Sequence, residues 1–310
     1  MRKKRILLVA IDSKYPNLAL AKVKKHFYDH NFLVGENYKK LTQKVEAIYV
    51  SCLFTWNLDK ALAWKKYDCP VYLGGSGISL TSKLPEEIDL IKPRINWGYT
   101  SRGCIRRCPW CSVHIREGSF KVVGDLLDLW DGSSKEISLL DNNILADPDH
   151  FNKISWQAIT YRIRLNFFQG LDFRLINRSV ARTLQATPHS RLRLSFDEPK
   201  NYDQVDYCIT ELEKVGIRQN TWFVLVGFNT TFEEDLYRIN FLRRRGQKVY
   251  LARYDFIRTP QNILLARWTQ SFKYFAKLTF TEFIRLPQNR LARLRAGINF
   301  PSIFPGFPEL

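Results

Sequence analysis

Ile6-Leu7-Leu8-Val9-Ala10 is the stretch of sequence that sets the fold of the first part of the chain. Every residue in it is apolar, which is typical of a parallel strand that is buried on both faces. Two similar apolar runs, at 47–51 and 71–73, predict further strands. They alternate with segments at 18–30 and 58–67, in which the apolar residues recur at helical spacing. This alternation predicts a doubly wound parallel sheet with right-handed crossovers. We therefore expect a small α/β domain over residues 1–93.

Residues 94–256 repeat the unit of strand followed by helix. The expected strands cover 95–100, 136–140, 165–168, 192–196, 221–226 and 249–254. Six such units predict a partial (β/α)6 barrel of the TIM type, in which functional side chains collect at the carboxyl ends of the strands. We expect residues 257–310 to form a basic, aromatic segment that closes the barrel. The fold class predicted for the whole chain is α/β.

The cysteine spacing points to a metal centre. Gly103-Cys104-Ile105-Arg106-Arg107-Cys108-Pro109-Trp110-Cys111 contains a C-x3-C-x2-C motif. Three thiolates this close together can hold three irons of a [4Fe–4S] cluster, which leaves the fourth iron open to a small molecule. Two alternatives stay open: a Cys3His zinc site that includes His114, and three thiols with a purely structural role.

This motif resembles the cluster loop of the radical S-adenosylmethionine superfamily. The resemblance extends over nearly the whole chain, through Leu140–Asn143, Gln169–Arg174 and Leu225–Asp235, to a largely uncharacterised group of these proteins from bacteria and their viruses. It implies that S-adenosylmethionine binds the open iron and is cleaved by one electron to a 5′-deoxyadenosyl radical. That radical would abstract hydrogen from a substrate. An electron donor such as flavodoxin or ferredoxin is implied as well.

The resemblance also implies roles for individual residues. Arg102, Arg106 and Arg107 flank the cluster and would favour its reduced form, unless they are surface charge. Cys104, Cys108 and Cys111 would ligate the cluster, and Trp110 and Gly227 would contact the adenine. The methionine amino group would be bound by Asp141, Asn142 and Asn143, and its carboxylate by Arg174. Ser195 and Asp197 would contact the ribose, and Gln169 is a further cofactor-binding residue. Two alternatives are an Asn-rich turn at 141–143 and an ion pair between Asp172 and Arg174.

The first domain resembles a reduced cobalamin-binding domain. The sequence argues against cobalamin ligated by histidine, because Asp12–Asn17 holds none. Gly74–Gly77 predicts a turn after a strand, with a phosphate cradle as the alternative. Only Cys52 and Cys69 precede the motif, which argues against a second cluster and so against methylthio transfer, although transfer remains one option. With Cys208 they are expected to be small core residues.

The charge of the chain suggests an anionic partner. The net charge is +18, and Arg243–Arg295 holds thirteen Lys or Arg against Asp255 and Glu282. Aromatic residues such as Phe256 and Trp268 are interleaved there, so the segment predicts binding of tRNA, RNA or DNA through phosphate contacts and base stacking. The alternatives are aromatics that pack inward, a peptide or small anionic substrate, and a zinc-bound nucleic-acid module without catalysis. No signal peptide or membrane span is expected, and we predict a cytoplasmic, reduced protein.

Overall fold

The protein is described by a computed structural model that covers residues 4–36, 44–254 and 258–297. Two compact units make up the chain, the first formed by 1–143 and 160–165 and the second by 144–159 and 166–310. This division falls inside the segment predicted as a barrel, so the predicted boundaries after residues 93 and 256 stay predictions. Phe256, Asp255 and residues 298–310 of the predicted closing segment lie outside the described residues.

The first unit begins with a four-stranded parallel sheet in the order β2-β1-β3-β4. Its strands are β1 (Arg5–Ala10), β2 (Leu33–Glu36), β3 (Ala47–Ser51) and β4 (Val71–Gly74). Three of these strands were predicted from their apolar runs. The sequence analysis missed β2, because it is only four residues long and carries Gly35 in its middle.

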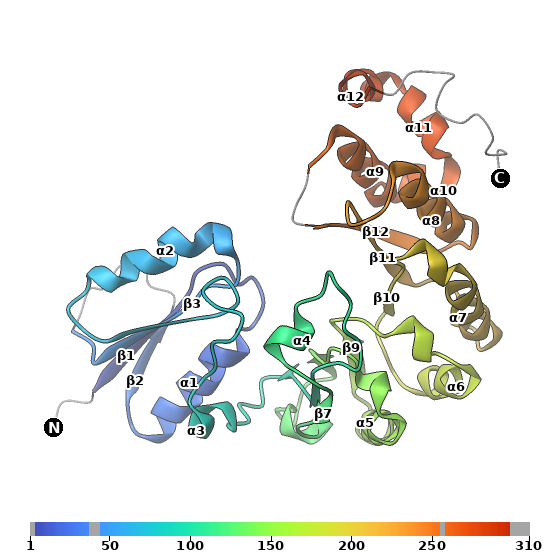
Figure 1. Ribbon diagram of the computed structural model, residues 1–310. Helices are drawn as coiled ribbons and strands as arrows, with labels where there is room; N and C mark the ends of the chain where they lie inside the picture. The colour runs from blue at the N-terminus through green and yellow to red at the C-terminus, as the bar shows by residue number, and fades with distance from the viewer. Residues whose placement is uncertain (1–3, 37–43, 255–257, 298–310) are drawn as a thin grey trace. The chain divides into compact units, whose positions relative to one another are not determined.

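Helices cover both faces of this sheet (Figure 1). Leu7 and Val9 of β1 pack into a core on the side of α2 (Leu58–Leu62) and η2 (Ala63–Lys66), which follow η1 (Thr55–Asn57). Ile6 and Leu8 face the opposite core, formed with α1 (Leu18–Asp29) and α3 (Glu86–Asp89). A continuous apolar run is therefore needed, because alternate side chains of one strand enter two different cores.

Each of the six strands predicted for residues 94–256 is present within one or two residues of its expected position. Within the described residues they form two three-stranded sheets, β5-β8-β9 and β10-β11-β12, and the α/β class with parallel sheets is confirmed. One continuous barrel sheet stays a prediction. The strands are β5 (Trp97–Gly98), β8 (Glu136–Leu139), β9 (Arg164–Phe167), β10 (Arg193–Ser195), β11 (Thr221–Val226) and β12 (Lys248–Arg253), and the helical elements between them are η3 (Leu126–Asp128), η4 (Ile144–Ala146), α5 (Pro148–Tyr161), η5 (Phe173–Leu175), α6 (Arg178–Ala186), η6 (Pro199–Asn201), α7 (Tyr202–Lys214) and α8 (Phe232–Arg244).

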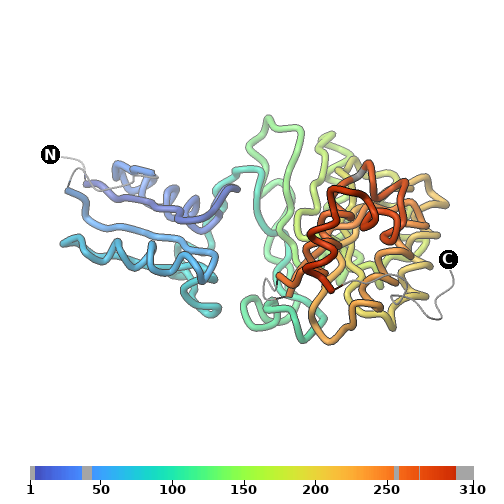
Figure 2. Tube along the Cα trace, turned by 90° about the horizontal axis from the view of Figure 1, so that it is seen from above, coloured from blue at the N-terminus to red at the C-terminus, as the bar shows by residue number. Residues whose placement is uncertain are grey.

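The described end of the chain is a group of short helices that pack on α9, drawn in orange to red in Figure 2. Trp268 of α9 is completely buried in this group, where its ring contacts Phe275 and Phe280 at centroid distances of 5.0 and 5.4 Å. Among the described helices, none has the length and apolar content that a membrane crossing needs. The elements are α9 (Pro260–Gln270), α10 (Phe272–Lys277), α11 (Phe280–Arg285), η8 (Pro287–Asn289) and α12 (Arg290–Arg295).

Candidate functional site

The three motif cysteines lie on one loop whose two ends are tied together. β6 (Ser101–Arg102) pairs antiparallel with β7 (Lys121–Val122), so residues 103–120 form a loop closed at its base. Gly103 stands where the chain leaves β6, with φ at +77°, and a Cβ there would lie 2.2 Å from the Ser119 carbonyl oxygen. A glycine is therefore required at this position, because any side chain would force the two ends apart.

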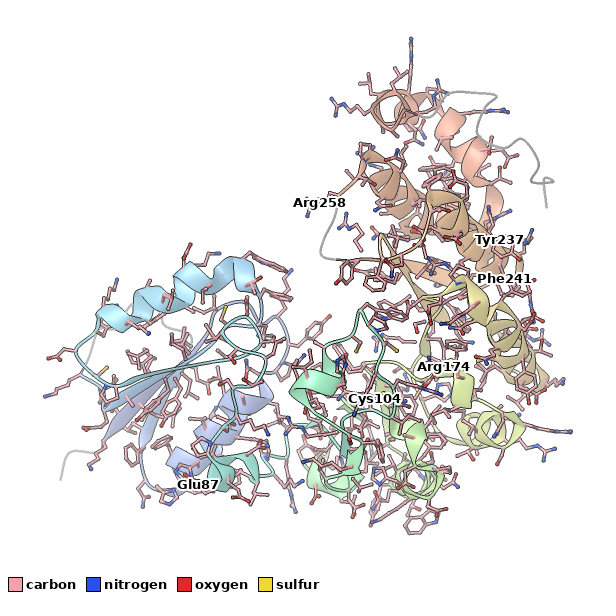
Figure 3. All side chains as sticks on the ribbon, in the orientation of Figure 1. Glu87, Cys104, Arg174, Tyr237, Phe241 and Arg258 are labelled. Atoms are coloured by element: carbon pink, nitrogen blue, oxygen red, sulfur yellow. The ribbon has the colours of Figure 1, made fainter. Side chains whose placement is uncertain are left out.

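The sulfur of Cys104 accepts two hydrogen bonds, and Figure 3 labels this residue in the loop that leads to α4 (Val113–Arg116). The Arg106 backbone N–H donates to its Sγ at 3.3 Å, and Asn143 Nδ2 donates to the same sulfur at 3.4 Å. Hydrogen bonds of this kind stabilise a thiolate and tune the potential of a cluster that it ligates. Asn143 is almost fully buried, so this donor is held in place by packing.

Cys108 and Cys111 lie in a turn of the same loop, where the Cys111 N–H donates to the Cys108 carbonyl at 3.0 Å. Trp110 lies in this turn and is half-buried. All six cysteines of the chain belong to the described part, and none of them forms a disulfide. Within that part, no three Cys, His, Asp or Glu side chains are gathered in a metal-binding arrangement, so the three thiols share a loop but not yet a common centre.

The residues present fit the chemistry of a cluster in three respects. The thiols are half-buried, the loop ends are fixed, and one sulfur already receives two N–H donors. Two polar nitrogen atoms near the motif, His114 Nδ1 and Asn142 Nδ2, are buried and have no hydrogen-bond partner among the described residues. Buried donors and acceptors are normally paired, so these two atoms have hydrogen-bonding capacity left for a ligand.

Asp141 has a structural position that differs from the one expected. Its carboxylate accepts hydrogen bonds from the backbone N–H and the hydroxyl of both Thr100 and Ser101, with the Thr100 Oγ1 contact at 2.7 Å. Burial raises the pKa of the Asp141 carboxyl, and these hydrogen bonds act in the opposite direction. The carboxylate is thus directed into the protein, where it fixes the turn between β5 and β6.

Arg102 is also engaged within the first unit. Its Nε donates to Glu117 Oε2 at 2.6 Å, and its Nη1 lies 3.3 Å from Asp89 Oδ2. Asp89 in turn pairs with Lys22 of α1 at 2.7 Å. This network connects the base of the cysteine loop to the helices α1 and α3 of the first sheet. The loop itself carries three further arginines, Arg106, Arg107 and Arg116.

Several of the residues predicted in the second unit have hydrogen-bond partners within that unit. Arg174 Nε donates to Asp172 Oδ1 at 2.6 Å, which is the ion pair named as the alternative, and Figure 3 labels Arg174. The Ser195 hydroxyl donates a hydrogen bond to the Asp197 carboxylate, which also accepts from the Leu225 N–H at 3.2 Å. Burial raises the pKa of Asp197.

Two further predicted residues lie in turns at strand ends. Gly227 follows β11 with φ at +83°, and the nearest atom to a Cβ built there is Asn262 Nδ2 at 3.9 Å. The conformation, rather than a close neighbour, therefore requires glycine. Gln169 is exposed in the turn after β9.

Arg238, which was not predicted, is completely buried and donates to the carbonyls of Phe196 and Leu225, so it holds β10 and β11 together.

The glycine-rich turn at 74–77 packs against the loop after β3. The Gly77 N–H donates to the Cys52 carbonyl, and Gly75 accepts from the N–H groups of Ile78 and Ser79. A Cβ on Gly75 would lie 2.3 Å from the Cys52 oxygen. These contacts are those of a tight turn, as predicted, rather than of an open phosphate cradle.

Cys52 and Cys208 are buried core residues, as expected, and Cys69 is half-buried against the core that contains Cys52.

In the basic segment from Arg243 to Arg295, most described cations are exposed, and several aromatic rings are buried. Phe275, Phe280 and Phe283 are buried with Trp268, so the prediction that Trp268 stacks on nucleic-acid bases is wrong. Phe272 has no described side chain. The exposed cations of this segment are Arg244, Arg258, Arg267, Lys273, Lys277, Arg285, Arg290 and Arg295.

No protein-family model matches the chain, and no curated protein matches it. The assignment of a function therefore depends on the chemistry of the residues described above.

Proposed function

We propose that the protein is a radical S-adenosylmethionine enzyme that binds a [4Fe–4S] cluster through Cys104, Cys108 and Cys111. The observation that carries this proposal is the C-x3-C-x2-C loop itself, closed at its base and with two N–H donors on Cys104 Sγ. When bound, such a cluster supplies the electron that splits S-adenosylmethionine. The chain's own residues hold the cluster, orient the cosubstrate and exclude water.

The roles proposed for neighbouring residues follow their contacts. Asn143 supports the Cys104 thiolate, and Asp141 holds the turn on which the loop begins. Asn142 is proposed to bind the amino acid end of S-adenosylmethionine, because its amide offers both an acceptor for an ammonium and a donor for a carboxylate. Its buried Nδ2 has no partner among the described residues.

The proposed substrate is a nucleic acid or a nucleotide-derived molecule. This part of the proposal is supported by the exposed cations of the last helices and by the net charge of +18. Lys and Arg that face solvent on one segment attract phosphates without reading a base sequence.

A zinc-bound nucleic-acid module is the second candidate, and His114 is the residue that favours it. Its buried Nδ1 has no partner among the described residues, and it follows Cys111 by three positions. Cys104, Cys108, Cys111 and His114 would then be the four ligands of a tetrahedral site. The two candidates differ in the metal that they bind and in whether they cleave S-adenosylmethionine.

The metal is tested by anaerobic purification and reconstitution. We expect about four irons and four sulfides per chain, with their loss when Cys104, Cys108 and Cys111 are changed together to Ala. Cys69→Ala, a half-buried cysteine outside the motif, should keep the iron and serves as the matched control. Stoichiometric zinc without iron uptake would decide for the zinc module.

The cosubstrate is tested with the reconstituted protein and a strong reductant, which should yield 5′-deoxyadenosine from S-adenosylmethionine. Asn142→Ala should weaken binding of S-adenosylmethionine while the iron content stays unchanged. Asn143→Ala should instead shift the reduction potential of the cluster, because it removes a donor to a ligating sulfur. If iron is bound but no S-adenosylmethionine is cleaved, the proposed activity is excluded.

The substrate class is tested by the salt dependence of binding to RNA and DNA. Six phosphate contacts would reduce affinity by about a thousandfold between roughly 50 and 200 mM salt. Changing Arg267, Lys273 and Lys277 to Gln should flatten the slope by about one contact for each side chain that touches phosphate. A flat salt dependence with only weak binding would favour a small anionic substrate.

A further inference from the structure

An exposed pair of aromatic rings follows the third strand of the first sheet, and the sequence analysis did not single it out. Phe54 and Trp56 follow β3 and stack on each other, with centroids 4.5 Å apart and planes 11° from parallel. Their exposed fractions are 39% and 57%, and the adjoining Leu53 is 36% exposed. Two stacked rings that stay in contact with solvent form a flat apolar surface.

The backbone that carries these rings is fixed from two sides. The Asp12 carboxylate, just after β1, accepts from the N–H groups of Leu53 and Phe54 at 2.9 and 3.0 Å. On the other side, a Cβ on Gly77 would lie 2.7 Å from the backbone of Phe54, so only glycine permits this contact. The rings are therefore presented by a rigid loop, which lowers the entropy lost when a ligand binds.

The pair also lies at the position in the sheet where doubly wound folds bind ligands. β1 and β3 are neighbours, and the chain leaves β1 toward α1 on one face and β3 toward α2 on the other. The carboxyl ends of two such strands border a crevice at the topological switch point. The loop with Phe54 and Trp56 starts from the carboxyl end of β3.

Two exposed lysines, Lys14 after β1 and Lys60 at the start of α2, belong to the segments that follow the carboxyl ends of these strands. Two aspartates are present in the same segments. The carboxylate of Asp12 is occupied by backbone donors, and Asp59 is exposed. The lysines can contact the phosphates of an anionic occupant.

We propose that Phe54 and Trp56 form a stacking platform for an unpaired base of a single-stranded nucleic acid. This inference rests on the proposed nucleic-acid substrate and assigns the base contacts to residues 54 and 56, in place of the buried Trp268. Stacking on aromatic rings accepts any base, because every base has a π-face, and the lysines supply contacts to phosphate.

The test is the affinity for a fluorescent single-stranded oligonucleotide, measured by anisotropy at several salt concentrations. Trp56→Ala should weaken binding by roughly 5- to 150-fold, the range expected for loss of one stacked base. The slope of affinity against salt should stay unchanged, because stacking releases no counterion. Trp56→Phe should recover part of the loss. A duplex of the same sequence should show a smaller effect.

Trp156→Ala is the matched control, since Trp156 of α5 is 63% exposed and lies outside the platform. Equal affinity of Trp56→Ala and the parent for the single strand would overturn the platform while the salt test of the substrate class still stands. Failure of the parent protein to bind any nucleic acid would instead remove the proposed substrate and the platform with it. Loss of self-association rather than of oligonucleotide binding in Trp56→Ala would show an interface between copies, and would also overturn the proposal.

Discussion

Residues 52–66 and residues 260–295 are both rich in aromatic and basic side chains, but they differ in how they place their rings. In the first segment Phe54 and Trp56 are exposed and only Trp64 is buried, whereas the second segment buries Trp268, Phe275, Phe280 and Phe283. Trp56 is 57% exposed, whereas Trp268 is fully buried. In the closing segment, rings from α9, α10 and α11 pack against one another, and Trp268 Nε1 donates to the Leu278 carbonyl at 3.0 Å. In the loop after β3, the Asp12 carboxylate accepts from the N–H groups of Leu53 and Phe54, and the rings of Phe54 and Trp56 stay exposed.

The comparison shows that aromatic content by itself does not indicate a stacking surface. A ring on an amphipathic helix is removed from water by the hydrophobic effect when a second helix can cover it. A ring on a short loop can stay exposed when the backbone of the loop is itself fixed at the carboxyl end of a strand. Changes in the two regions should therefore have different consequences for stability.

The largest effect is expected for Trp268→Ala. Removal of a fully buried tryptophan leaves a cavity and the Leu278 carbonyl without its donor, so the free energy of unfolding should fall by about 3–5 kcal/mol. Urea denaturation of the parent and the variant measures this difference. Arg267→Ala, the exposed neighbour on the same helix, is the control and should change stability by no more than about 0.5 kcal/mol. Equal stability of parent and Trp268→Ala would contradict the burial of this ring.

A smaller loss is expected for Gly75→Ala, which tests how firmly the platform loop is held. Gly75 has φ at +100°, and its Cβ would meet the Cys52 oxygen at 2.3 Å. A residue forced into such a conformation costs roughly 1–3 kcal/mol. Gly74→Ala is the control, because a Cβ there has no atom within 4 Å. Denaturation midpoints that do not separate the two variants would argue against a rigid loop.

The N-terminal cap of α11 allows a third test of stability, in the closing segment, with a smaller expected loss. Thr279 Oγ1 accepts from the Glu282 N–H at 3.2 Å, and the Glu282 carboxylate accepts from the Thr279 N–H at 2.7 Å. Thr279→Ala should cost about 1 kcal/mol. Thr281→Ala, inside the same helix, leaves the cap intact and serves as the control. Alanine has a higher helix propensity than threonine, so Thr281→Ala should not destabilise the helix. A loss of equal size in both variants would show that the cap is not its cause.

The same cap predicts a pH dependence. Hydrogen bonds from Thr279 lower the pKa of Glu282 below its ordinary value of 4.5. A lowered folded-state pKa means that the stabilising contribution is present above pH 4.5 and is lost as the pH falls through the lowered value. Thermal denaturation of Glu282→Gln between neutral and acidic pH should therefore show a weaker pH dependence than the parent protein. Parallel curves for the two proteins would show that Glu282 makes no titrating contribution.

The smallest effect on stability is expected for Trp56→Ala. An exposed ring contributes little to the folded state, so the free energy of unfolding should change by about 0.5 kcal/mol or less. Urea denaturation measures it beside the Trp268 variant. A loss as large as that of Trp268→Ala would show that the rings of 54 and 56 belong to the core, and the contrast between the two regions would disappear.

The strands were predictable because their signal is local. The apolar runs of β1, β3 and β11 can be read from a few consecutive residues, and each strand lies where that run is. The strands β2, β6 and β7 were missed, since segments of four, two and two residues contain too little pattern. Their existence depends on partners at a distance, such as the pairing of β7 with β6 across the cysteine loop.

Among the candidate site residues, the cysteine motif is equally local. Its spacing and the requirement for Gly103 are features of one loop. The partners of the polar residues at strand ends are not local, because Asp141 meets Thr100 and Ser101 about forty positions earlier in the chain. The sequence placed Asp141, Arg174 and Asp197 at strand ends but carried no information on whether their side chains face a ligand or one another.

By itself, the sequence determined the alternation of strands and helices, the α/β class, and the grouping of three cysteines with a metal-binding spacing. These properties follow from backbone periodicity and from residues that are neighbours in the chain. Only the tertiary structure decided that Asp141 is occupied by Thr100 and Ser101, and that Trp268 is covered while Trp56 is exposed. The physical reason is that hydrogen-bond satisfaction and burial depend on which distant segments pack together, and a side chain's type does not specify its neighbours.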